Sequence, residues 1–412
     1  MRIAIIGAGF TGLTAAYRLS QKGHHPVVFE KESQAGGLAS GFQEKDWQWP
    51  LEKFFHHFFT SDSAAQNLIQ ELDLGDKLFF PQPKTSIFKR GQISQFDSPL
   101  GLLAFPHLSL LEKVRTGAVI AYLKTINSWQ GLEKVTASAW LKKTMGQKPY
   151  QLLWQPLLQG KFGKFGEKIS MAWFWARIKK RSLKLGYLEG GFLILINRLI
   201  EKIKEKDGQV LLNHEVKSLE ELKNFDRIIV TAPAEMFLKL ISRLPKNYQS
   251  QLGKLKMLGA LNLVLVLKEK FLVDNTYWLN INEAGFPFVA VVEHTNFVEP
   301  KHYAHQHLVY VGGYYPQNHP YFKMKKEQIF KEFLPFLKRI NSRINPGSYQ
   351  LFSSQNAQPV VPLNYSKIIP ALGTPFPHLY LANMQMVYPW DRGVNNAIKL
   401  GEKVAEEALK NV

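Results

Sequence analysis

The sequence predicts an α/β protein with two interleaved domains, one with a parallel sheet and one with an α+β arrangement of mixed or antiparallel sheet plus helices. Three observations lead to this prediction. The chain opens on a strand, a glycine-rich loop, a helix and a second strand, and an α/β pattern returns near Gly190. At 412 residues the chain is too long for one compact core. The sequence contains no biased linker, so we expect the chain to cross between the domains more than once.

The composition is that of a globular protein and excludes several classes of site. Hydrophobic residues make up 45% and charged residues 21%, which disfavours disorder and a coiled coil. Cysteine is absent, which excludes disulfides, thiolate metal sites, a cysteine nucleophile and a cysteine-linked prosthetic group. The sequence has no apolar run long enough to cross a bilayer. We therefore expect a cytoplasmic protein in a reducing compartment.

The charge balance favours anionic partners. Lysine and arginine total 52 against 33 acidic residues, a formal net charge of +19. Phosphorylated substrates, membrane surfaces and nucleic acids are all compatible with this charge. The lysines are dispersed and the sequence has no nucleic-acid-binding motif, so we expect no nucleic acid partner.

The expected elements follow from the spacing of apolar residues. The first are a strand at 2–6, a helix at 11–22 and a strand at 26–30. Later helices are expected at 61–74, 110–145, 193–205 and 395–409, and a hairpin at 85–96 that turns at Arg90 and Gly91. The other expected strands are 210–212, 227–231, 258–267, 277–282, 286–293, 307–314 and 378–382. The four strands from 258 to 314 suggest a largely antiparallel sheet.

These elements divide the chain between the two domains. We assign residues 1–80, 185–240 and 372–412 to the domain with the parallel sheet, and residues 81–184 and 241–371 to the second domain, which we expect to bind substrate.

A dinucleotide-binding motif lies between the first strand and the first helix. Gly7, Gly9 and Gly12 form G-x-G-x-x-G in this context. Gly7 permits the tight turn, Gly9 lets the backbone approach a pyrophosphate, and Gly12 lets the helix pack on the strand. Glu30 ends the second strand, where a carboxylate can accept hydrogen bonds from ribose hydroxyls and disfavours NADP. This pattern predicts a Rossmann-like domain, and alone it leaves NAD and FAD as alternatives.

The residues after Glu30 resemble a flavoprotein family. The stretch from Glu30 to Leu38 is similar to the E-x(5)-G-G extension of flavoproteins related to amine oxidases, protoporphyrinogen oxidase, phytoene desaturase and UDP-galactopyranose mutase. Gly190-Gly191 with Val216, the Ala232-Pro233 strand end and the segments 379–383 and 393–401 also resemble this family. One departure is Asn383, where the family has an acidic residue. The other motifs match, so the resemblance implies FAD.

The resemblance implies a set of cofactor-binding residues, which includes Asn383 because an amide can still hydrogen-bond there. The implied residues are Gly7, Gly9, Phe10, Thr11, Gly12, Glu30, Lys31, Gly36, Gly37, Leu38, Val216, Ala232, Asn383, Gly393, Val394 and Asn395.

Three groups of residues are candidates for the chemistry. His56 and His57 stand among four phenylalanines, where the imidazoles could steer a proton or an anion, and core packing is the alternative. Arg392, with Asp391 to orient it, could hold a substrate anion or a flavin carbonyl, and a structural ion pair is the alternative. Lys161 is a substrate-side candidate, and for it a solvated lysine is the favoured alternative. We expect no metal site, because no further ligands stand near the histidines at metal-binding spacing.

The resemblance implies an FAD-dependent, amine-oxidase-like oxidoreductase of a bacterial subgroup, in which the flavin accepts a hydride from a C–N or C–C bond of a small, anionic or lipid-like substrate. The FAD is expected to be non-covalent. One alternative is a non-redox flavin enzyme of the UDP-galactopyranose mutase type, and another is a flavin- or lipid-binding protein without catalysis. The sequence leaves substrate, electron acceptor and oligomeric state open.

A leucine-rich stretch from 100 to 126 has two interpretations. Its leucines are followed closely by Lys113, Arg115 and Lys124, so the segment could lie on an anionic membrane surface, on the inner face. The favoured alternative is that these leucines face the core of the protein.

Overall fold

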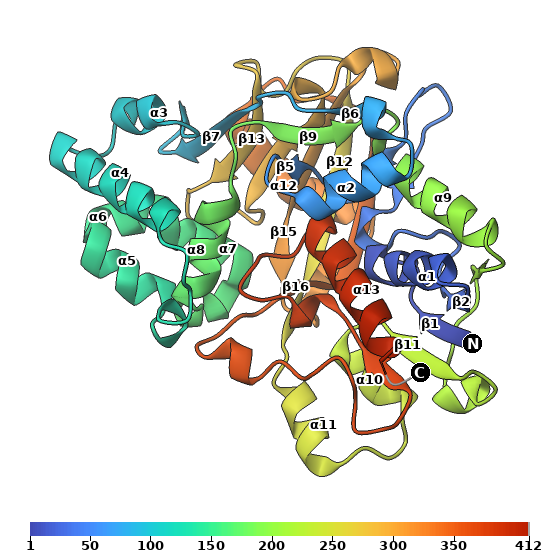
Figure 1. Cartoon of the computed structure of the whole chain (residues 1–412). Coiled ribbons are helices and arrows are strands. Elements are labelled where there is room, and N and C mark those ends of the chain that lie inside the picture. Colours follow the sequence, from blue (N-terminus) through green and yellow to red (C-terminus); the bar gives the residue numbers. More distant parts are fainter. Residues whose placement is uncertain (411–412) are drawn as a thin grey trace.

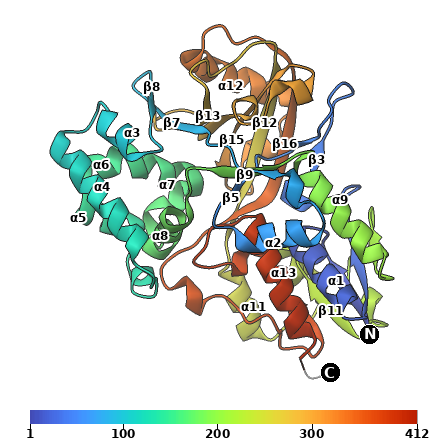
Figure 2. The ribbon, with the colours of Figure 1, turned by 45° about the horizontal axis from the view of Figure 1, so that its top comes forward.

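The first sheet of the protein is parallel and contains five strands. A computed structural model describes residues 1–410 and shows this sheet beside a second large sheet (Figures 1 and 2). The strand order is β10 (Gln209–Leu211), β2 (His25–Phe29), β1 (Arg2–Ile6), β11 (Arg227–Val230) and β17 (Leu379–Leu381). All four neighbouring pairs are parallel, so the carboxyl ends of the strands meet at one edge.

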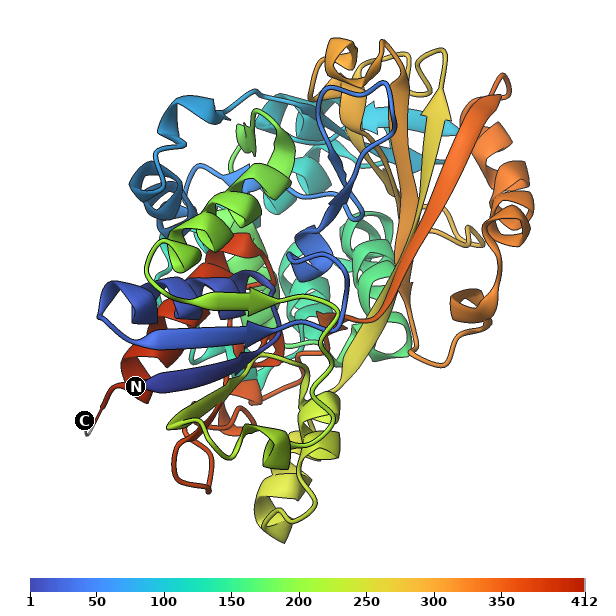
Figure 3. The ribbon, with the colours of Figure 1, turned by 90° about the vertical axis from the view of Figure 1, so that its right-hand side faces the viewer.

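Three helices pack together beside this sheet. The central one is α1 (Phe10–Gln21), which contacts α9 (Gly191–Lys204) and α13 (Val394–Ala408). Figure 3 shows α1 and α13 side by side along the sheet. A Cβ added at Gly401 of α13 would lie 2.5 Å from the backbone oxygen of Thr11, so glycine permits the close contact of the two helices. The short helix α2 (Ser63–Glu71) packs on α13.

The second sheet has seven strands. Its order is β16 (Pro346–Pro359), β12 (Met257–Leu267), β15 (His307–Tyr315), β14 (Ala290–Glu293), β13 (Thr276–Ile281), β7 (Lys84–Lys89) and β8 (Gln92–Gln95). Its pairs are antiparallel except β13 with β7, which is parallel. All eleven residues of β12 are buried, and the helix α12 (Lys326–Ile340) covers one side of this sheet.

The residues between β8 and β9 (Leu185–Leu188) are mostly helical and lie at the left of Figure 1. They form α3 (Pro99–Ala104), α4 (Leu110–Thr125), α5 (Ala137–Met145), α6 (Gln147–Pro149), α7 (Gln155–Phe162) and α8 (Met171–Lys180). Ser109 and Glu112 form a capping box at the start of α4. Two further helices, α10 (Ala234–Leu240) and α11 (Lys246–Gly253), follow β11.

Short strands join the two large sheets. A two-stranded sheet pairs β3 (Gly41–Phe42) with β4 (Leu51–Glu52). A three-stranded one places β9 between β5 (Phe58–Phe59) and β6 (Leu78–Phe79). These strands bring residues 51–59 between the two large sheets, so that Asn262 of β12 donates to the backbone oxygen of Lys53 at 3.1 Å.

The predicted fold class is confirmed, with a parallel-sheet α/β part and a largely antiparallel second sheet. The hairpin at 85–96 forms as β7 and β8 and turns at Arg90 and Gly91. The prediction of helix from 110 to 145 was too long, because α4 ends at Thr125 and α5 begins at Ala137. The domain boundaries remain a prediction, and residues 411–412 of the last segment lie outside the described residues.

The prediction that the leucines from 100 to 126 face the core is only partly correct. Leu102 and Leu108 are buried. Leu100 of α3 is 77% exposed, and Leu110 and Leu111 of α4 are 70% and 77% exposed, because α4 packs on the protein through only one side. No helix among residues 1–410 combines the length and the apolar composition that a membrane crossing would require.

Candidate functional site

The three glycines of the first loop serve different purposes. Gly7 has a φ of +105°, which favours glycine, and a Cβ there would lie 2.5 Å from Thr231 Oγ1. A Cβ at Gly12 would lie 2.0 Å from the backbone oxygen of Gly7. A Cβ at Gly9 would meet no atom of residues 1–410 within 4 Å. Gly7 and Gly12 are therefore needed by the fold, whereas Gly9 leaves room for an atom that is not part of the protein.

The second glycine pair lies against this loop. Gly36 and Gly37 have φ values of +112° and +56°. The backbone nitrogen of Gly36 donates to the oxygen of Ala8 at 2.8 Å, and a Cβ at Gly37 would lie 3.7 Å from the Cα of Gly9. The two glycine turns thus face each other, with Leu38 half-buried beside them. This arrangement fits a diphosphate, which a glycine-lined backbone can approach closely.

Glu30 has a structural role that the sequence did not predict. Its Oε2 accepts a hydrogen bond from the Ala8 backbone at 2.8 Å, and its Oε1 accepts one from the Glu32 backbone at 3.0 Å. Each carboxylate oxygen can accept a second hydrogen bond, so Glu30 remains able to bind a ribose hydroxyl. Lys31 is exposed and pairs with Glu32 at 3.4 Å, so its side chain does not point into the loop.

Two other predicted cofactor residues, Asn383 and Val216, have engaged or buried side chains. Asn383 is 3% exposed, accepts from the Gln385 backbone at 3.0 Å and donates to the oxygen of Ala232 at 3.0 Å. Asn383 therefore links the ends of β17 and β11, a role in which an amide supplies the donor that a carboxylate lacks. Val216 packs in an apolar cluster with Ala4 and Phe29 of the parallel sheet, so its backbone rather than its side chain is available to a ligand.

The glycine at the N-terminus of α13, like Gly9, has free space where a side chain would lie. A Cβ at Gly393 would meet no atom within 4 Å among the described residues, whereas Val394 behind it is buried. Asn395 is also buried, and its Oδ1 accepts from the Ala65 backbone at 3.1 Å, which ties α2 to α13. Phe10 and Thr11, at the start of α1, are likewise buried. Two helices, α1 and α13, thus begin beside open glycines, where their partial positive charge can act on an anionic ligand.

A buried ion cluster precedes α13. Asp391 Oδ2 lies 2.5 Å from Lys161 Nζ and 3.5 Å from Arg177. Trp173 Nε1 donates to Asp391 Oδ1 at 3.1 Å. Burial alone would raise the pKa of Asp391, but Lys161, Arg177 and Arg392 together hold this pKa well below its usual range. Lys161 is only 8% exposed, so the alternative of a solvated lysine is wrong.

Arg392 joins this cluster to the seven-stranded sheet. Its Nε donates to Gln358 Oε1 at 3.0 Å and its terminal nitrogen donates to the hydroxyl of Tyr314 at 2.6 Å. Burial raises the pKa of Tyr314, but the charges of Arg392 and Lys161 outweigh burial and bring this pKa below its usual value. Three cations, Lys161, Arg177 and Arg392, therefore surround a single carboxylate. The excess positive charge suits an anionic substrate group or an electron-rich ring.

The two histidines lie near this cluster and are neutral at pH 7. Burial lowers the pKa of His56 to about 4, with a further contribution from Arg392, and its Nδ1 lies 2.6 Å from the backbone oxygen of Phe54. Burial and the charge of Arg181 lower the pKa of His57 to about 3, and its Nδ1 lies 3.4 Å from the hydroxyl of Tyr277. Both histidines are half-buried, so part of each side chain is open to a bound molecule.

Aromatic rings extend from the histidines toward the seven-stranded sheet. The ring of His57 lies 6.1 Å from that of Trp278, and the ring of Phe55 lies 4.7 Å from that of Trp278 and 6.0 Å from that of Tyr310. Phenylalanines beside the histidines were expected from the sequence. Trp278, Tyr310 and Tyr314 were missed, because each comes from a strand more than 200 residues away in the chain.

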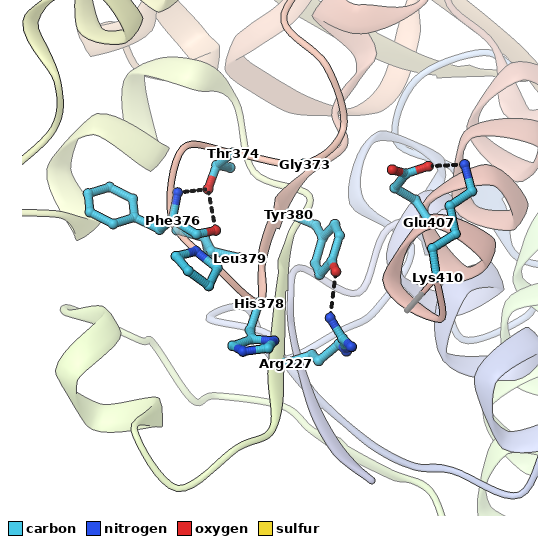
Figure 4. A pocket seen from close by; sticks show the side chains of 10 residues that line it. Arg227, Gly373, Thr374, Phe376, His378, Leu379, Tyr380, Glu407 and Lys410 are labelled. Carbon is cyan, nitrogen blue, oxygen red and sulfur yellow. Dashed lines mark hydrogen bonds and ion pairs between the residues drawn. The ribbon is translucent and has the colours of Figure 1, made fainter. Parts of the chain in front are cut away.

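A different pocket lies at the opposite edge of the parallel sheet (Figure 4). It has a volume of about 560 Å³ and is lined by the beginnings of β11 and β17, where Arg227 donates to the hydroxyl of Tyr380 at 2.7 Å. Ligands of open α/β sheets bind outside the carboxyl ends of the strands. The pocket is at the amino ends, so it is separate from the glycine loop and the ion cluster.

Comparisons with known proteins give a consistent result. A family model described as flavin containing amine oxidoreductase matches residues 10–409. The 15-cis-phytoene desaturase of Solanum lycopersicum is 26% identical over 318 residues, which are 67% of this chain and 54% of that protein. The chain therefore spans about half the length of this relative.

Solved structures resemble the whole chain. An oxidoreductase from Methanosarcina mazei has a TM-score of 0.75 at 19% identity and covers 98% of this chain and 100% of its own. A reduced UDP-galactopyranose mutase has a TM-score of 0.77 at 14% identity and covers 100% of this chain and 94% of its own. At these identities the likeness establishes the fold.

Proposed function

Because the chain belongs to the family of flavin-containing amine oxidoreductases, we propose that it is an oxidoreductase that binds FAD non-covalently and oxidises a C–N or C–C bond of a small molecule. Members of this family contain flavin, and the absence of cysteine excludes attachment through that residue. Polyenes are the first substrates to test, since the curated relative is named a phytoene desaturase.

The facing glycine turns support FAD as the cofactor. The two turns at Gly9 and Gly37 would hold the pyrophosphate, Glu30 would accept from the adenosine ribose, and the N-terminus of α13 would face the ring. When bound, FAD supplies the oxidising chemistry by accepting a hydride from the substrate.

The ion cluster around Asp391 is the observation that carries the proposal. Arg392 and Lys161 would stabilise negative charge that develops beside them during oxidation. Asp391 keeps Lys161 in place, whereas Gln358 and Tyr314 keep the guanidinium of Arg392 in place. Tyr314 ionises more readily than an ordinary tyrosine, and Arg392 would hold its phenolate oxygen. Once ionised, that oxygen would take the proton that the substrate loses together with the hydride. The rings of Phe55 and Trp278 would exclude water.

A second candidate function is non-redox flavin catalysis of the UDP-galactopyranose mutase type. The observation that favours it is that two arginines act on Asp391: Arg177 contacts it at 3.5 Å, and the charge of Arg392 contributes to its lowered pKa. Arginine binds diphosphates through two donors. The solved mutase structure has the same fold. A mutase acts on nucleotide sugars with reduced flavin and leaves it reduced, whereas an oxidoreductase bleaches its own flavin when substrate is added without oxygen.

The test begins with the bound flavin. We expect heat denaturation of the purified protein to release FAD into the supernatant, identified by chromatography. Glu30→Ala should weaken FAD binding by about 1–3 kcal/mol, because it removes charge-assisted hydrogen bonds. Gly9→Val should abolish binding, because the added methyl groups enter the space for the pyrophosphate.

Gly131→Val is the matched control, since a Cβ at Gly131 also meets open space among the described residues, and its φ of −68° is compatible with valine. Unchanged FAD binding in Gly9→Val would contradict the assignment. The anaerobic bleaching screen then uses amines, polyenes, porphyrinogens and nucleotide sugars. Bound FAD that none of these bleaches or turns over would favour a carrier without catalysis.

A further inference from the structure

The outer side of α4 is apolar along its whole length. Its exposed positions include Leu111, Val114, Ala118, Ala121 and Tyr122, which recur every three or four residues and so share one face of the helix. Leu111 is 77% exposed, Val114 57% and Tyr122 54%. The helix packs on the protein through the opposite side, where Thr116 and Leu123 are fully buried. Val119 and Ile120 also pack against the core, so α4 is apolar on both sides, whereas an amphipathic helix of a globular protein normally exposes a polar side.

The neighbouring helix α3 extends this apolar face. Leu100 and Leu103 are exposed on α3, and Lys113 Nζ of α4 donates to the backbone oxygen of Leu103 at 2.6 Å, which holds the two helices together. Ten large apolar side chains are exposed among residues 1–410, and six of them lie between 100 and 122. A contiguous apolar patch of this kind marks an interaction site rather than scattered surface residues.

Basic residues border the apolar face. Residues 98–148 contain seven lysines and arginines against two glutamates. A pocket of about 270 Å³ opens beside Leu111 and is bordered by Arg115, Lys148 and Glu112, of which the last two form an ion pair at 3.4 Å. Arg115 is fixed in place, since its guanidinium donates to the backbone oxygens of Thr144 at 2.5 Å and Lys143 at 2.8 Å. Exposed cations beside exposed leucines match the two layers of a bilayer surface, an anionic headgroup layer above acyl chains.

We propose that the face formed by α3 and α4 binds the surface of a bilayer that contains anionic lipid. The leucines would enter the boundary between headgroups and acyl chains, and the lysines and Arg115 would contact lipid phosphates. A second copy of the chain is a poorer occupant, because a symmetric contact would bring the same cations together. In Figures 1 and 2 both helices stand at the periphery of the molecule, where a flat surface can reach them.

The binding helix is connected to the ion cluster. Lys124 of α4 donates to the backbone oxygen of Arg181 at 3.1 Å, and Lys179 of α8 donates back to the oxygen of Lys124 at 2.5 Å. The same helix α8 carries Arg177, which contacts Asp391. A bilayer on the outer face would therefore lie one helix away from the candidate active site, the arrangement needed for a lipid-like substrate.

Vesicle flotation of the purified full chain tests this proposal. We expect the chain to float with vesicles of phosphatidylcholine and phosphatidylglycerol at low salt, less at moderate salt, and weakly with phosphatidylcholine alone. The double substitution Leu110→Gln/Leu111→Gln should lower the partition coefficient about tenfold or more, since two apolar side chains lose their burial. Lys143→Gln/Lys148→Gln should weaken binding only to the anionic vesicles.

The matched control is Val273→Gln, because Val273 is 76% exposed but lies on the segment between β12 and β13. It should float like the unaltered chain. Absence of flotation at low salt, or equal loss in Val273→Gln and Leu110→Gln/Leu111→Gln, would overturn the proposal. Sedimentation provides one further outcome: a dimer that Leu110→Gln/Leu111→Gln dissociates, without vesicle binding, would assign the face to a second copy.

Discussion

Glu52, which is buried, and Asp391, which is half-buried, are two carboxylates whose acidities have moved in opposite directions. Burial raises the pKa of Glu52 to about 7, and its two hydrogen bonds only partly offset this shift. The pKa of Asp391 lies well below its usual range although burial acts on it as well. Depth in the protein therefore does not decide whether a carboxyl group is charged at neutral pH.

The difference comes from the neighbours. Glu52 Oε1 accepts from the Phe192 backbone at 2.7 Å and Oε2 accepts from the hydroxyl of Tyr187 at 2.7 Å, and both donors are neutral. Asp391 instead contacts the cations Lys161 and Arg177. Neutral donors position a carboxyl group, whereas cations also keep it ionised. The first arrangement serves the fold where β4 meets α9, and the second serves the candidate active site.

The largest effect is expected from removing the charge of Asp391. Asp391→Asn leaves Lys161 buried without its counter-ion, so unfolding free energy should fall by about 3–5 kcal/mol. Adding Lys161→Met should restore part of this loss, since the unpaired charge is then gone. Chemical denaturation at pH 7 measures both variants. Asp73→Asn is the control, because Asp73 pairs with Arg198 at 3.3 Å but is 76% exposed, and it should cost less than about 1 kcal/mol.

A smaller and pH-dependent effect is expected at Glu52. Its folded pKa of about 7 lies above the ordinary value of 4.5, so its contribution to stability is fully present below pH 4.5 and is lost as pH rises through 7. Glu52→Gln cannot ionise. The unfolding free energy of Glu52→Gln minus that of the unaltered chain should therefore rise by about 3 kcal/mol between pH 4.5 and pH 7.

The subtraction is needed because the buried histidines have the opposite dependence. Burial lowers the pKa of His56 to about 4 and of His294 to about 3, so these residues destabilise the fold as pH falls below 6.5. Their contribution is common to both proteins and cancels. A difference that stays constant with pH would show that Glu52 is ionised in the folded state.

The smallest effect is expected from Tyr187→Phe. This change removes one hydrogen bond to Glu52, which should cost about 0.5–1.5 kcal/mol. It should also raise the pKa of Glu52 further, because the lost bond favoured the charged form. The pH-dependent difference described for Glu52→Gln should then extend to higher pH when it is measured in the Tyr187→Phe background. A shift to lower pH would mean that Tyr187 stabilises the neutral acid instead.

Local patterns in the sequence were sufficient to predict the part of the chain that forms the parallel sheet. The resemblance to amine-oxidase-like flavoproteins is confirmed by the family match, and the opening strand, helix and strand form close to the predicted positions. These elements depend on neighbouring residues, because a glycine loop and an apolar repeat act over short distances. The structural need for glycine at Gly7 and at Gly12 is also a local steric effect, because a Cβ at either position would clash with nearby atoms.

Features that depend on distant contacts could not be predicted. The strand β16 was missed because it is an edge strand with many exposed polar residues, and it forms by pairing with β12. Lys161 and Asp391 are 230 residues apart, so no local pattern indicates their contact. The exposed leucines of α4 have the same periodicity as buried ones, and only the packing of Thr116 and Leu123 shows which face is outside.

The order of strands in the parallel sheet has a consequence for synthesis of the protein. β1 contains residues 2–6, but its neighbour β11 is made more than 200 residues later, and β17 more than 370 residues later. On the ribosome, the first strand and its glycine loop therefore wait with one edge unpaired while the helical region and two strands of the second sheet, β7 and β8, are made. Because α13 follows β17, the candidate cofactor site is completed only after residues 394–408 have been made. A chain released early would expose apolar strand edges to its neighbours, so we expect premature termination products to aggregate rather than persist as partly active protein.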